Sequence, residues 1–179
     1  MSRPFARPRI ALGDVIQPAP AARRGAMRPM VAAAVAIGAV LLVSFAGALF
    51  PPGAWYEGLA KPGFTPPNAV FGPVWGVMYT FNAIALYLLL RAPVSAARRA
   101  ALAAMALQLA LNAAWTPVFF GAQMIGLALV VIAALALAIV AAIFAARRVS
   151  GVAAALLLPY LGWVAFASAL NAALWTLNR

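Results

Sequence analysis

Hydrophobic residues fill the chain in five long stretches with few polar interruptions. The stretches cover residues 30–50, 70–90, 100–120, 122–146 and 151–178. A helix needs roughly 20 apolar residues to cross the hydrocarbon core of a membrane, and each stretch reaches that length. None alternates between polar and apolar residues, as the strands of a transmembrane barrel would. The pattern predicts an all-α integral membrane protein, a five-transmembrane-helix bundle formed by residues 29–179.

Composition agrees with this fold class. Hydrophobic residues make up 67% of the 179 residues and charged residues only 8%, which places the chain outside the range of soluble globular domains.

Residues 1–28 differ from the rest because they combine prolines and arginines without hydrophobic periodicity. Such a segment is predicted to be a disordered basic cytoplasmic arm that contacts membrane lipids through anionic headgroups. A cleaved signal peptide is the competing interpretation. The apolar run that follows is about twice the length of a signal-peptide core, which favours a retained first helix.

The basic residues gather on one side of the membrane if the five helices alternate in direction. That side receives eleven of the 13 basic residues, namely Arg3, Arg7, Arg9, Arg23, Arg24, Arg28, Arg91, Arg98, Arg99, Arg147 and Arg148. The other side receives only Lys61 and Arg179. By the positive-inside rule the N-terminus is cytoplasmic, and a bacterial inner membrane is the expected location. The orientation of the helices in the membrane accounts for the excess of basic residues, so no nucleic acid partner is expected.

Histidine and cysteine are absent from the chain, and its two acids, Asp14 and Glu57, fall outside the predicted spans. Thiolate nucleophiles, imidazole bases and zinc sites are therefore excluded, and the sequence predicts no catalytic residue and no metal site. An ion-coupled pump is disfavoured because it normally carries an acid or a histidine within the membrane.

Aromatic and amide side chains occupy one stripe on each of three predicted helices. At helical spacing the stripes consist of Trp75, Tyr79 and Asn82; of Gln108, Asn112 and Trp115; and of Trp163, Phe166, Ala167, Leu170 and Asn171. Because adjacent helices run in opposite directions, the stripes should meet at one depth, in a cavity in the non-cytoplasmic half of the bundle. An aromatic cavity with few polar groups suits a large, flat, mostly apolar ligand. The alternative is that the aromatics form an interfacial belt and that the amides join helices.

The connector formed by residues 55–67 is predicted to be a lid on this cavity, with Trp55, Tyr56, Lys61 and Pro62 as its members. Thr65 is expected to cap the next helix, with Pro66 in its first turn. Alanines along residues 100–114 predict either a homodimer seam or close packing inside the bundle.

The aromatic, proline and amide positions recur in order in three segments that resemble one known family. They include Trp55, Tyr56, Lys61, Pro62, Trp75 and Tyr79; then Asn112, Trp115 and Pro117; then Pro159, Tyr160, Trp163, Phe166, Ala167, Asn171 and Asn178. The pattern resembles the TspO/MBR family, the tryptophan-rich sensory proteins and peripheral-type benzodiazepine receptors, over residues 30–179.

This resemblance implies a five-helix bundle, often dimeric, that binds porphyrins such as protoporphyrin IX and haem. Some members bind sterols or synthetic ligands. By the resemblance, Trp75 and Trp163 are pocket tryptophans, and further lining comes from Asn112, Trp115, Phe166 and Ala167. Tyr56, Lys61 and Pro62 belong to the lid.

The expected function is that of a membrane tetrapyrrole-binding sensor or regulator with porphyrin as ligand and no obligatory cofactor. Two alternatives are a transporter of porphyrin or lipid and a porphyrin-degrading photo-oxidative enzyme. A transporter should show repeats or interrupted helices, and Pro159 is the one candidate interruption. Enzymatic activity is the less favoured alternative, because no general acid or base lies near the predicted cavity.

Overall fold

The computed structural model describes residues 25–179. Its helices are α1 (Pro29–Ala48), α2 (Ala54–Gly58), α3 (Asn68–Arg91), α4 (Ala96–Thr116), the π-helical segment η3 (Pro117–Gly121), α5 (Ile125–Ala146) and α6 (Gly151–Leu177). Five of the described helices are long and apolar enough to cross a membrane, which confirms the predicted fold class. The predictions for residues 1–24 of the arm lie outside the described residues.

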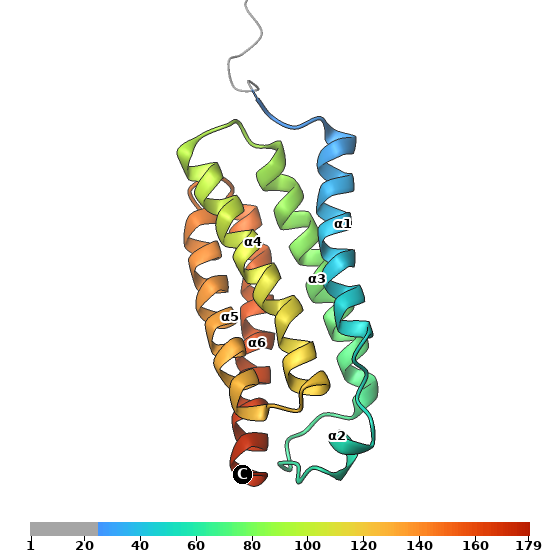
Figure 1. The fold of residues 1–179 in the computed structure, drawn as a ribbon. Helices are drawn as coiled ribbons and strands as arrows, with labels where there is room; N and C mark the ends of the chain where they lie inside the picture. The colour runs from blue at the N-terminus through green and yellow to red at the C-terminus, as the bar shows by residue number, and fades with distance from the viewer. Residues whose placement is uncertain (1–24) are drawn as a thin grey trace, which may run out of the picture.

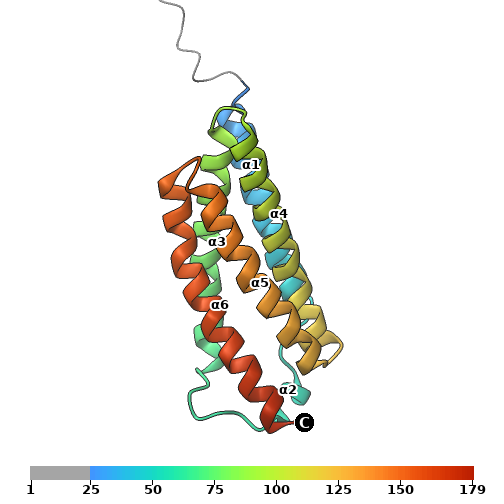
Figure 2. The ribbon, with the colours of Figure 1, turned by 90° about the vertical axis from the view of Figure 1, so that its left-hand side faces the viewer.

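The five long helices stand side by side in one bundle (Figure 1). α4 packs against α5, α5 against α6, α6 against α3 and α3 against α1, and α1 closes the ring on α4. Figure 2 shows the C-terminus and α2 at the same end of the bundle, opposite the first described residues. We call these the α2 end and the arginine end.

Small side chains make up much of the packed interior. Ala85, Ala101, Ala142 and Ala153 have no exposed surface, and they alternate along the helices with larger residues such as Ile139. Alanine brings helix backbones close together, and dispersion contacts then stabilise the bundle where no hydrophobic force acts between helices in lipid. On α4, however, Ala100, Ala103, Ala106, Ala110 and Ala114 are exposed rather than packed inside. Internal packing therefore does not explain these five alanines.

A buried arginine organises the arginine end. The Arg98 guanidinium donates hydrogen bonds to the carbonyl oxygens of Leu89 and Leu90, at 3.1 and 3.0 Å, and to that of Gly25 at 3.2 Å. Arg91 donates to the carbonyl oxygen of Met27 at 2.6 Å. The last carbonyls of a helix lack their usual partners within the helix. Arg98 gives those of Leu89 and Leu90 a charged donor, beside the backbone N–H groups of Ala92 and Met27. Arg91 and Arg98, whose charge the sequence analysis attributed to membrane orientation, thus also hold the start of the bundle in place.

The start of α3 differs from the prediction. The helix begins at Asn68 after Pro67, which provides no side-chain cap. The Thr65 hydroxyl instead donates to the carbonyl oxygen of Pro62 at 2.8 Å. The expected Thr65 cap and the placement of Pro66 in the first turn are therefore wrong. The local turn satisfies Thr65 before the helix begins.

Candidate ligand-binding site

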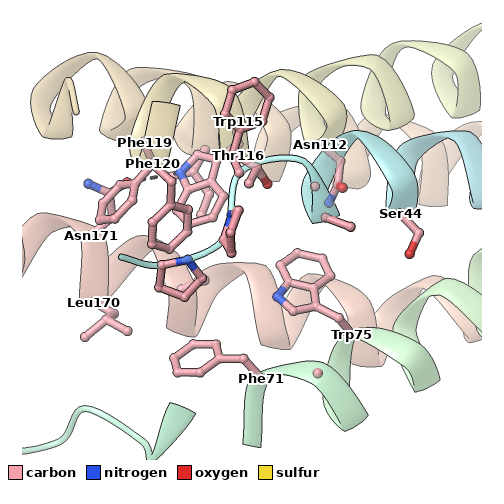
Figure 3. A pocket seen from close by; sticks show the side chains of 18 of the residues that line it. Ser44, Phe71, Trp75, Asn112, Trp115, Thr116, Phe119, Phe120, Leu170 and Asn171 are labelled. Carbon is pink, nitrogen blue, oxygen red and sulfur yellow. Dashed lines mark hydrogen bonds between the residues drawn. The ribbon is translucent and has the colours of Figure 1, made fainter. Parts of the chain in front are cut away.

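A cavity of about 470 Å³ lies between the long helices at the α2 end. Residues of α1, α3, α4, η3, α5 and α6 line it, together with Tyr56 of α2. None of the lining residues in the described part of the chain, residues 25–179, is charged. Figure 3 shows Trp75 and Phe71 of α3 facing Trp115, Phe119 and Phe120 across the open space.

Most of the residues predicted to bind a ligand line this cavity. They are Trp75, Tyr79, Asn112, Trp115, Trp163 and Ala167, and Tyr56 joins them from the connector. Phe166, Trp55, Lys61 and Pro62 are not among the lining residues. Phe166 lies behind the wall, where its ring packs on Trp163 at 5.4 Å and on Phe64 of the connector at 6.3 Å between ring centroids.

One wall consists of aromatic rings from α3 and α6. The rings of Trp75 and Trp163 stand almost perpendicular, at 86°, with centroids 6.4 Å apart. Trp75 also packs on Tyr79 at 5.4 Å, and Phe71 packs on Trp163 at 5.9 Å. Edge-to-face contacts of this kind favour fixed ring orientations. The wall is therefore held in shape by its own aromatic contacts.

The opposite wall forms where α4 changes into the π-helical segment η3. Trp115 and Phe119 stack at 5.0 Å with an interplanar angle of 23°. In an α-helix these residues, four positions apart, already share a face, and the wider turn also brings Phe120 within 6.0 Å of Trp115. The Trp115 indole nitrogen donates to Asn171 Oδ1 at 3.1 Å, which ties the wall to α6.

Polar groups join three helices beside the cavity. The Tyr79 hydroxyl donates to Asn112 Oδ1 at 3.0 Å, and Asn112 Nδ2 donates to the Tyr160 hydroxyl oxygen at 2.9 Å. One turn deeper, Gln108 Nε2 donates to Asn82 Oδ1 at 2.9 Å. The stripes of α3 and α4 therefore meet as predicted. Tyr160 completes the junction, although the sequence stripes did not include it.

Two buried polar atoms have no hydrogen-bond partner among the described residues, namely Trp163 Nε1 and Gln108 Oε1. An unpaired buried donor is costly in an apolar setting. Trp163 lines the cavity, so its indole N–H is the wall's unsatisfied donor.

The connector contributes one residue, Tyr56, to the α2 end of the cavity. Tyr56 is buried and packs on Phe120 at 5.4 Å. Burial raises the pKa of the Tyr56 phenol. Lys61 Nζ lies 4.8 Å from the centre of the Tyr56 ring and donates to the carbonyl oxygen of Glu57 at 2.8 Å. Lys61 thus holds the connector together.

Asn178, just beyond the end of α6, fastens the same connector to the bundle. Its side-chain Oδ1 accepts from the Ala60 N–H at 2.9 Å, and its Nδ2 donates to the Ala60 carbonyl oxygen at 2.9 Å. The amide therefore pairs with the Ala60 backbone as a neighbouring strand would. We call this pair of bonds the Asn178 latch.

Sequence reasoning missed the contribution of α1 to the cavity. Ser44, Gly47 and Ala48 line it, as do Phe50, Pro51 and Pro52 just beyond the helix. The sequence carries only a weak indication that these residues line the cavity. Small residues at positions i, i+3 and i+4 share a helix face, and they interrupt a run of Leu, Val and Phe.

The fold and this site together define a multi-pass helical membrane protein with an aromatic cavity at one end of the bundle. The sequence profile of the TspO/MBR family matches residues 31–176. The chain therefore belongs to the TspO/MBR family.

Named relatives agree with this assignment. The tryptophan-rich protein TspO of Archaeoglobus fulgidus is 43% identical over 143 residues, covering 78% of this chain and 92% of the relative. The human translocator protein is 42% identical over 127 residues, covering 70% of this chain and 75% of the human protein. The tryptophan-rich sensory protein of Cereibacter sphaeroides is 37% identical over 132 residues, covering 74% and 82%.

Proposed function

We propose that the chain is a membrane sensor or regulator that binds a tetrapyrrole in the cavity at the α2 end. The observation that carries this proposal is the aromatic lining of a 470 Å³ cavity that contains no charged residue. Flat conjugated rings gain most of their affinity by packing on such walls. Trp75 and Trp163 would contact the macrocycle, and the Trp163 indole N–H would gain an acceptor.

The chemistry of the side chains favours a metal-free porphyrin. A haem iron would find neither histidine nor cysteine, because the chain has none. The hydroxyl of Tyr79, a lining residue, already donates to Asn112. Propionate groups would lie at the solvated rim, since no cation lines the cavity. Protoporphyrin IX is therefore the ligand of choice for a test.

Titration of the protein with protoporphyrin IX in lipid nanodiscs tests the proposal. Trp75→Ala and Trp163→Ala each remove a wall ring, so each should weaken binding about tenfold or more, which corresponds to roughly 1.4 kcal/mol. Trp175→Ala is the matched control, because Trp175 is a partly exposed tryptophan of α6 that does not line the cavity. Binding that is unchanged in both wall variants would contradict the proposal.

The two rival functions have weaker support. A transporter with a broken helix is disfavoured because α6 continues from Gly151 to Leu177 through Pro159. A photo-oxidative enzyme would rely on indole side chains as redox partners, since no acid, base or thiol lines the cavity. A new product spectrum under light and oxygen, lost in Trp75→Phe, would favour that enzyme over a sensor.

The proposal extends to orientation and assembly. The arginine end would face the cytoplasm of a bacterial inner membrane, and the cavity would then lie in the non-cytoplasmic half. A homodimer would use the exposed alanines of α4, Ala103, Ala106 and Ala110 among them, because small residues let two helices approach closely. Membrane lipids would cover the same surface in a monomer.

A further inference from the structure

α1 and α3 are packed at the arginine end and unpacked beside the cavity. The buried residues of α1 end at Val43, and those of α3 begin only at Met78. In contrast, burial continues to the α2 end on the other side of the bundle, where Phe119, Ala128 and Leu174 are buried. The cavity is thus closed by packed helices on the α4–α5–α6 side and not on the α1–α3 side.

Small residues border the seam between α1 and α3 at the level of the cavity. Ser44, Gly47 and Ala48 lie on the α1 side, and Gly72 and Gly76 lie on the α3 side. A Cβ atom added at Gly72 or Gly76 would meet no atom within 4 Å. The neighbouring large residues of α1 do not fill the seam either.

Phe45 and Leu49 are those large residues, and they remain 63% and 58% exposed. They are the bulky side chains of α1 at this level, and their exposure places them on the lipid-facing surface. The large side chains of α1 at this level therefore do not cover the seam between α1 and α3.

Several contacts hold the connector against the bundle. The Asn178 latch fixes the Ala60 backbone through two hydrogen bonds of 2.9 Å. Phe64 packs on Phe166, and buried Tyr56 packs on Phe119 and Phe120. A ligand that displaced the connector would have to break these contacts.

We propose that the ligand enters and leaves the cavity sideways, through the seam between α1 and α3, from the membrane leaflet at the α2 end. This inference rests on the proposed function of the cavity. A flat apolar ligand partitions into the bilayer before it meets the protein, since each apolar Å² removed from water contributes roughly 25 cal/mol. Passage through the seam keeps that surface out of water and leaves the Asn178 latch intact.

Reversible cross-links across each route test this inference. The chain has no cysteine, so introduced pairs are its only thiols. One variant, Ala48→Cys with Gly72→Cys, spans the seam. The other, Ala60→Cys with Asn178→Cys, spans the connector and is the matched control. Each is joined by a bis-methanethiosulfonate linker in nanodiscs and released by reduction. Association and dissociation of protoporphyrin IX are then followed by quenching of tryptophan fluorescence.

The seam cross-link should slow both association and dissociation at least tenfold, because it blocks the path between α1 and α3. Reduction should restore both rates. The connector cross-link should leave the rates within twofold. Rates that fall only with the connector cross-link would overturn the inference, and so would rates that are unaffected by the seam cross-link. Absence of binding to the unmodified protein would instead contradict the proposed function, and this inference with it.

Discussion

Asn112 uses both ends of its side-chain amide to join three helices. Its oxygen accepts from Tyr79 of α3 and its nitrogen donates to Tyr160 of α6. A hydrogen bond between membrane helices contributes on the order of 1 kcal/mol, and a buried group that loses its partner costs more. The residue is therefore both part of the cavity wall and a structural junction.

We expect Asn112→Ala to lower the free energy of unfolding by about 1–2 kcal/mol, because both tyrosine hydroxyls lose their partner. The measurement is an SDS unfolding titration of the purified protein. Thr80→Val is the control, since the exposed Thr80 hydroxyl bonds only to the Gly76 carbonyl oxygen of its own helix. Equal stability of Asn112→Ala and the wild-type protein would show that these bonds contribute nothing to the bundle.

At the residue scale, regular helix spacing indicates which side chains share a helix face. Trp75, Tyr79, Asn112, Trp115 and Trp163 all line the cavity that their spacing predicted. Phe166 has the same helical spacing but lies behind Trp163, against Phe64 of the connector. Spacing fixes the face of a helix, whereas the path of a distant connector decides whether that face is open or covered.

At each end of the bundle, a side chain fastens a helix to a neighbouring segment of the chain. At the arginine end, Arg98 donates to the carbonyls of Leu89 and Leu90 in α3 and also bonds to the Gly25 carbonyl. At the α2 end, the Asn178 latch joins the connector to α6. Asn178 bonds to a backbone 118 residues away, and Arg98 bonds to that of Gly25, 73 residues away. Neither of these contacts follows from local pattern.

Arg98→Leu should destabilise the protein by roughly 3 kcal/mol or more, because hydrogen bonds to a charged group contribute about 1.5–3 kcal/mol each and three carbonyls lose a donor. The stability of Arg98→Lys should lie between those of the wild-type protein and Arg98→Leu, since the lysine ammonium lacks the planar set of donors of a guanidinium. The same SDS titration measures these differences. Arg99→Leu is the matched control, because Arg99 is exposed on the next position of α4. A loss as large in Arg99→Leu as in Arg98→Leu would contradict this role.

At the scale of the whole molecule, the two ends of the bundle differ in their number of basic residues. Arg28, Arg91, Arg98, Arg99, Arg147 and Arg148 belong to the arginine end, and Lys61 and Arg179 belong to the α2 end. The positive-inside rule predicts which end faces the cytoplasm.

Single cysteines test this orientation, because the chain has none of its own. Gly63→Cys places a thiol in the connector, and Ala96→Cys places one at the exposed start of α4. A membrane-impermeant maleimide should label Gly63→Cys in right-side-out vesicles and Ala96→Cys in inside-out vesicles. The opposite pattern of labelling would reverse the proposed orientation.

The sequence by itself determined the class of the protein, the number of its membrane helices and the helix faces that carry aromatic and amide groups. Lipid imposes these features locally, because every span must satisfy its own backbone and present apolar side chains. Only the tertiary structure decided that α1 lines the cavity, that η3 widens the turn beside Phe119, and that Asn178 holds the connector. These features depend on which helices become neighbours, and apolar patterns in a membrane do not encode neighbours because every helix face is equally soluble in lipid.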